Sequence, residues 1–147
     1  TYRKMAEDTV DQAATIARLD PPACATKTLR IHGHAERAEE FGELAVYGSD
    51  ALSILNLVRE SPRNAEPLHP ALETIEAEVA WAARSEMART VEDVLSRRTR
   101  CLLFNAAASV EAAPRVAEIL ARELGRDAAW QAAQVRAYEE TAAVYRL

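Results

Sequence analysis

Three observations predict an all-α fold for this chain, a single bundle-like domain of about six or seven helices. Alanine is abundant, whereas there are only 4 glycines and 5% aromatic residues, a balance that favours helices over sheets. Apolar residues recur at spacings of three and four along most of the chain. With 147 residues and no internal repeat or low-complexity linker, the chain has the length of one ordinary domain.

Charge and apolar runs exclude several classes of protein. The net charge of −5 comes without a basic stripe, which argues against a nucleic-acid partner. The longest apolar run, Cys101–Val110, is too short to span a bilayer, and no signal peptide is visible. Cys24 and Cys101 stand alone, without a metal-binding spacing, and we expect both to be reduced and buried in a cytoplasmic protein.

The first half of the chain predicts three helices. Residues 1–19 form the first, which Asp20 and two prolines end. Residues 28–32 are extended at most, and a second helix covers residues 35–46 until Gly48 stops it. Ser49 is then expected to cap a helix over residues 50–59. Val10, Ala13, Ala14 and Ala17 give the first helix a flat face of small residues that another element can approach closely. The second helix offers Phe41, Leu44 and Ala45, and the residues expected inside in the third are Leu52, Leu55, Leu57 and Val58.

The second half predicts four more helical segments. A proline-containing loop over residues 61–70 precedes a helix that starts at Pro70 and ends near Arg84. A helix capped by Thr90 follows, and Pro114 either kinks the next helix or starts a new one, which Gly125 ends. The final helix begins near Asp127. The stripes expected to face inward are Leu72, Ile75, Val79 and Ala82; Val116, Ile119, Leu120 and Leu124; and Val135, Tyr138, Ala142 and Tyr145.

The helix that begins at Thr90 is the most informative segment. Thr90 and Asp93 form a close variant of the capping box, and Asp93 can pair with Arg97 four residues on. Arg98 falls on the same stripe as Val91, Val94, Leu95 and Leu102. A buried cation requires a dedicated partner, because an unpaired buried charge costs several kcal/mol. We therefore expect Asp93, Arg97 and Arg98 to stabilise the core or a docking face, with an internal partner for Arg98 favoured over one across a domain interface.

No self-contained active site is predicted. His32 and His34, with Glu36 beyond and His69 as a third ligand, could hold a metal, but two histidines in an ordinary loop explain this spacing better. Glu92 and Asp93 point about 100° apart on a helix, so they cannot act together as acid and base. No glycine-rich phosphate loop follows a strand, and no serine or cysteine has a neighbouring histidine to activate it. We therefore expect no catalytic residue and no metal ligand.

Several motifs nevertheless resemble one family. They are Thr1-Tyr-Arg-Lys-Met-Ala-Glu, Leu44-Ala-Val-Tyr-Gly-Ser-Asp-Ala51, Pro67-Leu-His-Pro70, Glu78-Val-Ala-Trp-Ala-Ala-Arg84, Glu86-Met-Ala-Arg-Thr-Val-Glu-Asp-Val-Leu-Ser-Arg-Arg-Thr99 and Pro114-Arg-Val-Ala-Glu-Ile-Leu-Ala-Arg-Glu-Leu-Gly125. In this order they resemble the C-terminal part of aerobic, FAD-dependent glycerol-3-phosphate dehydrogenase. The block from Thr90 to Thr99 is the most specific of them.

The resemblance implies a supporting domain rather than an enzyme. Residues 1–20 would be the last helix of the FAD-binding domain, with Thr1 near the flavin in the full-length protein, and residues 21–147 would be the C-terminal helical domain. The family oxidises sn-glycerol 3-phosphate to dihydroxyacetone phosphate and passes electrons through FAD to a quinone. The implied partners are the N-terminal FAD and substrate domains of the same polypeptide, and contacts with a second copy and with the inner face of the cell membrane stay open. No FAD is expected on this chain alone.

Two other classes of function stay open. One is a free-standing helical interaction module, and the other is a small metal-dependent enzyme that uses His32 and His34. The chain opens inside a helical pattern without Met, so we expect it to be part of a longer polypeptide. A reading frame upstream that encodes a dinucleotide-binding fingerprint would support the dehydrogenase, whereas a start codon near Thr1 would favour the module.

Overall fold

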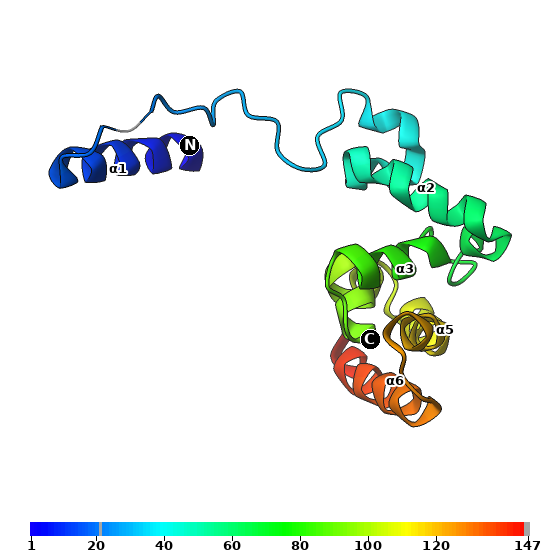
Figure 1. Cartoon of the computed structure of the whole chain (residues 1–147). Helices are drawn as coiled ribbons and strands as arrows, with labels where there is room; N and C mark the ends of the chain where they lie inside the picture. The colour runs from blue at the N-terminus through cyan, green and yellow to red at the C-terminus, as the bar shows by residue number, and fades with distance from the viewer. Residues whose placement is uncertain (21, 146–147) are drawn as a thin grey trace. The chain divides into compact units, whose positions relative to one another are not determined.

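The computed structural model describes residues 1–20 and 22–145 and contains helices, turns and one isolated antiparallel bridge between Pro67 and Ile75. The predicted all-α fold is confirmed for this part of the chain. The contacts divide it into two units, residues 1–36 (unit 1) and residues 37–147 (unit 2), and each is described separately (Figure 1). The predicted boundary at residue 20 stays a prediction.

Unit 1 consists of α1 (Tyr2–Ala17) and a segment of turns without a strand among its described residues. Arg18 ends α1 in the left-handed conformation (φ 54°), and its N–H group bonds to the carbonyl oxygens of Ala14 and Thr15. Of the residues expected on an inward face, only Ala14 is buried, whereas Val10 is 60% exposed. The predicted helix is therefore confirmed, and its small-residue face is mostly exposed within unit 1.

Unit 2 begins with a 3₁₀ segment, η1 (Ala38–Asp50), so the prediction of an α-helix over residues 35–46 is wrong. Gly42 (φ 57°, ψ −126°) and Gly48 (φ 54°, ψ −126°) interrupt it with backbone conformations that residues other than glycine rarely adopt. α2 (Ala51–Glu60) then starts with Asp50 at its N-cap, so Ser49 is not the cap. The turn at Gly48 therefore places the N-cap of α2 one residue later than predicted.

The inward face of α2 also differs from the prediction. Ala51, Ile54 and Leu57 are buried, whereas Leu52 is 55% exposed, and Leu55 and Val58 are only partly buried. A short 3₁₀ turn, η2 (Pro62–Ala65), follows, and residues 66–75 fold back on themselves. The N–H group of Leu68 donates to Thr74 O at 2.9 Å, and that of Glu76 donates to Glu66 O at 3.0 Å.

Because of these bonds the next helix begins later in the sequence than Pro70, so its predicted start is wrong. α3 (Glu76–Ser85) begins six residues later, yet Leu72, Val79 and Ala82 are buried as predicted. After α3 come the π-helical turn η3 (Asp93–Arg98) and the short α4 (Cys101–Phe104). Both belong to the segment that carries the candidate site.

Two long helices complete unit 2. α5 (Ala106–Leu124) runs through Pro114 as one helix and ends at Gly125 in the left-handed conformation, as predicted. Asn105 caps it through an N–H···O bond from Ala108, a cap that we did not predict. α6 (Ala128–Ala142) starts at the predicted Asp127 cap, and η4 (Ala143–Tyr145) follows it. Tyr145 is 49% exposed, so its predicted inward position is wrong.

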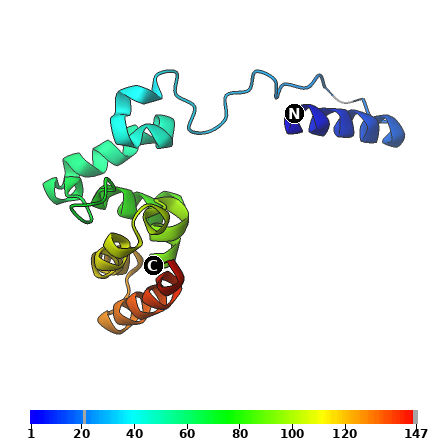
Figure 2. The same ribbon diagram turned by 180° about the vertical axis from the view of Figure 1, so that it is seen from behind.

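The core of unit 2 lies where α5 packs against α3 and α6 (Figures 1 and 2). Val116, Ile119 and Leu120 are fully buried there. Tyr138 of α6 is also buried, and its hydroxyl donates to Ser109 Oγ of α5 at 2.9 Å. Ser109 Oγ in turn donates to the carbonyl oxygen of Ala106, so both buried hydroxyl groups are satisfied.

Replacing Tyr138 with Phe should lower the free energy of unfolding by about 1 kcal/mol, because it removes one buried hydrogen bond and keeps the ring in place. Urea unfolding followed by circular dichroism measures this difference. Tyr145→Phe is the matched control, since Tyr145 is half exposed and should change nothing. Equal losses of unfolding free energy in the two variants would contradict a stabilising hydrogen bond between Tyr138 and Ser109.

Candidate functional site: a cleft in unit 2

The segment after α3 folds around the predicted capping box. The N–H group of Asp93 donates to Thr90 Oγ1 at 3.0 Å, and the N–H groups of Thr90 and Arg89 donate to Asp93 Oδ2 at 3.0 Å. The capping box at Thr90 is therefore confirmed. The predicted stripe is confirmed as well, because its four apolar members are buried: Val91, Val94, Leu95 and Leu102.

The helix that Thr90 starts becomes a π-helix, which the sequence did not predict. The N–H group and the hydroxyl of Thr99 both donate to Val94 O, at 2.9 and 3.0 Å, five residues back. The wider turn rotates the following positions relative to an α-helix. Arg98 consequently leaves the buried stripe, and its side chain is 31% exposed, so the predicted position in an inner seam is wrong.

Arg98 has its partner within unit 2. Its Nε and Nη2 donate to the carbonyl oxygen of Glu86 at 3.2 and 2.6 Å, and Nε lies 3.6 Å from the Glu86 carboxylate. These contacts connect η3 with the end of α3. The partial exposure of both side chains means that the pair contributes less than a fully buried ion pair would.

Asp93 and Arg97 lie on the outer side of the same turn. Arg97 donates to Asp93 Oδ1 at 2.8 Å, which confirms the predicted pair, and to Glu92 Oε1 at 2.6 Å. Burial alone would raise the pKa of Asp93, but the hydrogen bonds from Arg89 and Thr90 and the charge of Arg97 outweigh it. The pKa of Asp93 therefore lies below its ordinary value of 3.8.

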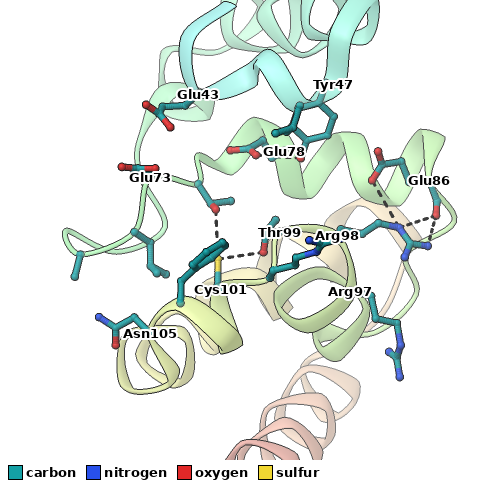
Figure 3. A pocket seen from close by; sticks show the side chains of 16 residues that line it. Glu43, Tyr47, Glu73, Glu78, Glu86, Arg97, Arg98, Thr99, Cys101 and Asn105 are labelled. Atoms are coloured by element: carbon teal, nitrogen blue, oxygen red, sulfur yellow. Dashed lines mark hydrogen bonds and ion pairs between the residues drawn. The ribbon is translucent and has the colours of Figure 1, made fainter. Parts of the chain in front are cut away.

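A cleft of about 770 Å³ opens between η1, the loop over residues 66–75, α3 and the turn from η3 to α4 (Figure 3). Its charged lining comprises Glu43, Glu73, Glu78, Glu86, Arg98 and Arg100. Arg97 also borders it, although its guanidinium bonds to Glu92 and Asp93. We did not predict the cleft, because its walls come from segments far apart in the sequence.

Glu78 is the buried carboxylate of the cleft, with 8% of its surface exposed. It accepts the N–H group of Ile75 at 2.7 Å, which caps α3, and the hydroxyl of Tyr47 at 3.0 Å. Burial raises the pKa of Glu78, and these two hydrogen bonds oppose the rise only in part. Burial and the charge of Glu78 likewise raise the pKa of Tyr47.

Glu43 and Glu73 both line the cleft (Figure 3). The neighbouring carboxyl group of Glu73 raises the pKa of Glu43 above its ordinary value.

The floor and rim of the cleft carry groups of other kinds. Cys101 is buried as predicted, and its sulfur accepts the Thr99 hydroxyl at 3.1 Å and contacts the Thr74 hydroxyl at 3.3 Å. Cys24 is exposed, so its predicted burial is wrong. At the rim, Val46 and Phe104 are 86% and 81% exposed. The cleft thus combines an acidic wall, a thiol and apolar edges.

The candidate metal ligands do not come together in a described site. Within residues 1–20 and 22–145, no group of three or more His, Cys, Asp and Glu side chains could hold a metal ion. His32 and His34 belong to unit 1, and His69 of unit 2 bonds through Nε2 to Glu111 and accepts the Ala71 N–H group at Nδ1. Thr1 precedes α1 without a side-chain cap bond, and nothing in unit 1 tests its expected place near a flavin.

Comparison with known proteins gives a family. Residues 24–131 match the family described as the C-terminal domain of alpha-glycerophosphate oxidase. The chain is 33% identical to the mitochondrial glycerol-3-phosphate dehydrogenase of Mesocricetus auratus over 97% of its length, and 31% identical to a probable mitochondrial glycerol-3-phosphate dehydrogenase of Caenorhabditis elegans over 99%. It is 33% identical to the glycerol-3-phosphate dehydrogenase of Synechocystis over 67% of its length.

The chain spans about a fifth of these relatives, since the matches cover 22%, 22% and 21% of their lengths. No solved structure matches the chain. In the described part of the chain, no helix is long and apolar enough to cross a membrane.

Replacing Arg98 with Ala should lower the free energy of unfolding by about 1 kcal/mol, because the bonds to Glu86 are lost at a partly exposed position. Arg100→Ala is the matched control, since no hydrogen bond or ion pair holds that side chain among the described residues. Thermal and urea unfolding measure both variants. A loss of several kcal/mol of unfolding free energy for Arg98→Ala would contradict the partly exposed position of Arg98 and support the buried position that the sequence predicted.

Replacing Asp93 with Asn should lower the free energy of unfolding by about 1–2 kcal/mol at neutral pH, because the charged cap is lost. The folded-state pKa of Asp93 is lowered, so its contribution is present above 3.8 and is lost as the pH falls through the lower folded-state value. The difference from the wild type should therefore shrink in acid. Glu140→Gln, at an exposed position of α6, is the control. A stability difference between Asp93→Asn and the wild type that does not change with pH would contradict the stabilising role of the charged Asp93 carboxylate.

Proposed function

Because the chain belongs to the family of the C-terminal domain of alpha-glycerophosphate oxidase and FAD-dependent glycerol-3-phosphate dehydrogenase, we propose that it is the non-catalytic helical domain of such an enzyme. The observation that carries the proposal is the match of residues 24–131 to a C-terminal domain, together with coverage of about a fifth of the relatives. The role of this domain is to pack on the catalytic body and support it.

In this proposal the redox chemistry belongs to the rest of the parent polypeptide. That part binds FAD, oxidises sn-glycerol 3-phosphate to dihydroxyacetone phosphate and passes electrons to a quinone. The lining of the cleft supports this division, because among the described residues it offers a thiol and carboxylates but no histidine that could activate a nucleophile. The parent enzyme would lie in the cytoplasm or at the inner face of the cell membrane.

α1 supports the assignment of residues 1–20 to the FAD-binding domain. Tyr2, Met5 and Ile16 are 89%, 69% and 84% exposed, and on a helical wheel they share one side with Val10. An exposed apolar helix face of this kind requires a partner surface. The FAD-binding body of the same polypeptide would cover it and bring Thr1 towards the flavin.

The three residues of the Thr90 segment have different proposed roles. Asp93 and Arg98 stabilise the segment itself, through the capping box and the bonds to Glu86. Arg97 is half exposed and is the residue of the three that can contact the catalytic body. A second copy of the chain could contact the same surface.

The chain alone should neither retain FAD nor oxidise sn-glycerol 3-phosphate. Purified protein is mixed with FAD, desalted and examined for flavin absorbance, and turnover is followed with a dye as electron acceptor. A flavoprotein loaded in the same way is the positive control. Stoichiometric flavin on the desalted chain would overturn the proposed division of labour.

The reading frame upstream of the codon for Thr1 distinguishes the proposal from a free-standing interaction module. Several hundred codons that include a βαβ unit with a GxGxxG fingerprint are expected. A start codon close to Thr1 would instead favour the module.

A further inference from the structure

Two exposed apolar side chains border the cleft from different walls. Val46 belongs to η1 and Phe104 to α4, and they are 86% and 81% exposed. The same lining includes the partly buried Tyr47 and the buried Leu72. Single exposed apolar residues are common on protein surfaces, whereas several that border one concave surface indicate a binding site.

Arg100 is the arginine of the cleft that has no partner. The other two arginines of the lining, Arg97 and Arg98, pair with carboxylates of unit 2. Arg100 is exposed, and no hydrogen bond or ion pair holds its side chain among the described residues. It is the N-cap of α4, and Phe104 is the last residue of that helix, so about 6 Å of helix separates the free cation from the exposed ring.

The lining favours a peptide segment over a small ligand. Small-molecule sites are usually enclosed by apolar side chains, with few polar groups. Here the buried polar groups of the cleft already have partners, since Glu78 accepts the Tyr47 hydroxyl and the Cys101 sulfur accepts the Thr99 hydroxyl. The groups left to bind a partner lie at the exposed rim.

The charges at the rim indicate what such a segment carries. Arg100 fits a carboxylate, which a guanidinium binds with strong charge-assisted hydrogen bonds. Figure 3 shows Glu43 and Glu73 at the end of the cleft away from Arg97 and Arg98. A carboxylate near these two glutamates would be repelled, so opposite charges favour one orientation of an acidic segment.

The rest of the parent polypeptide supplies the occupant. The lining residues lie between positions 43 and 105, inside the matched range 24–131. The matches cover only 22%, 22% and 21% of the relatives' lengths, which leaves most of each relative outside them. In the proposed function, this remaining length is the catalytic body on which unit 2 packs.

We infer that the cleft is the surface on which the catalytic body docks, through a segment that places a carboxylate against Arg100 and an apolar side chain against Val46 and Phe104. The inference rests on the proposed function. It adds which face of unit 2 docks and which side chains bind the segment.

Hydrogen exchange compares the 147-residue chain with the full-length polypeptide that contains it. In the full-length polypeptide, amides of residues 44–47 and 101–105 should gain about tenfold or more protection relative to those of α6, because the docked segment has to open before they exchange. No residue of α6 lines the cleft, so its amides report the general stabilisation of unit 2.

Two substitutions on α4 separate docking from folding. Phe104→Ser should reduce the added protection in the full-length polypeptide about tenfold or more, because burial of one phenylalanine is lost. Leu103→Ser is the matched control, since Leu103 is 65% exposed on the same helix but does not line the cleft. In the 147-residue chain, both variants should unfold at nearly the same urea concentration as the wild type.

Substitutions of Arg100 test the charge. In the full-length polypeptide, Arg100→Glu should remove most of the added protection, whereas Arg100→Lys should keep a large part of it. Arg126→Glu is the control, because Arg126 is exposed, lies outside the cleft lining and has no side-chain bond among the described residues.

Three results would overturn the inference. One is equal protection of the cleft amides in the full-length polypeptide and in the 147-residue chain. Another is a full-length Phe104→Ser variant indistinguishable from Leu103→Ser. The third is cleft protection in the 147-residue chain that rises with protein concentration, since a second copy would then be the occupant.

Flavin content distinguishes this failure from failure of the proposed function. A full-length polypeptide that contains no FAD would overturn the proposed function. One that contains FAD but leaves the cleft amides unprotected would overturn only the docking surface.

Discussion

The close packing of α5 against α3 and α6 is the constraint on which the rest of unit 2 depends. Alanines occupy much of the contact: Ala77 and Ala80 on α3 and Ala112, Ala113 and Ala117 on α5 are almost completely buried. Methyl side chains let helix axes approach closely, and the larger apolar side chains then fill the space between them. Once α3 and α5 are packed in this way, the segment between them has to turn within a short distance. The Thr90 cap, the π-helical turn and α4 are the result.

The cleft is a consequence of the same arrangement, because it forms at the side of the alanine-rich contact where backbone turns replace helices. Its polar groups bond locally: Glu78 caps α3, Thr99 bonds to Val94 and Cys101, and Arg98 bonds to Glu86. The chain matches only about a fifth of the length of its relatives. Unit 2 therefore combines a helical core with one edge whose polar side chains bond within the cleft walls.

The sequence predicted regular helices better than it predicted turns. The ends of α5 and α6 at Gly125 and Asp127 follow from side chains and backbone conformations within a few residues, and these predictions are confirmed. The predicted start of α3 at Pro70 is wrong because the chain turns back over residues 66–75 instead of forming a helix. The N–H group of Leu68 bonds to Thr74 O and that of Glu76 bonds to Glu66 O. The predicted helix over residues 35–46 failed because Gly42 adopts a conformation that periodicity does not reveal. Of the hydrogen bonds at the candidate site, those between Thr90 and Asp93 and between Asp93 and Arg97 were predicted, since each spans only three or four residues.

By itself, the sequence determined what depends on near neighbours: the helical class, most apolar stripes, the capping box and the resemblance to the C-terminal region of glycerol-3-phosphate dehydrogenases. Tertiary structure alone decided which residues from distant segments meet. It brought Tyr47 to Glu78, and it moved Arg98 from the expected buried stripe to the edge of the cleft. The physical reason is that a helical pattern specifies which side of a helix is apolar, whereas the packing of one helix on another specifies which polar groups are left facing each other.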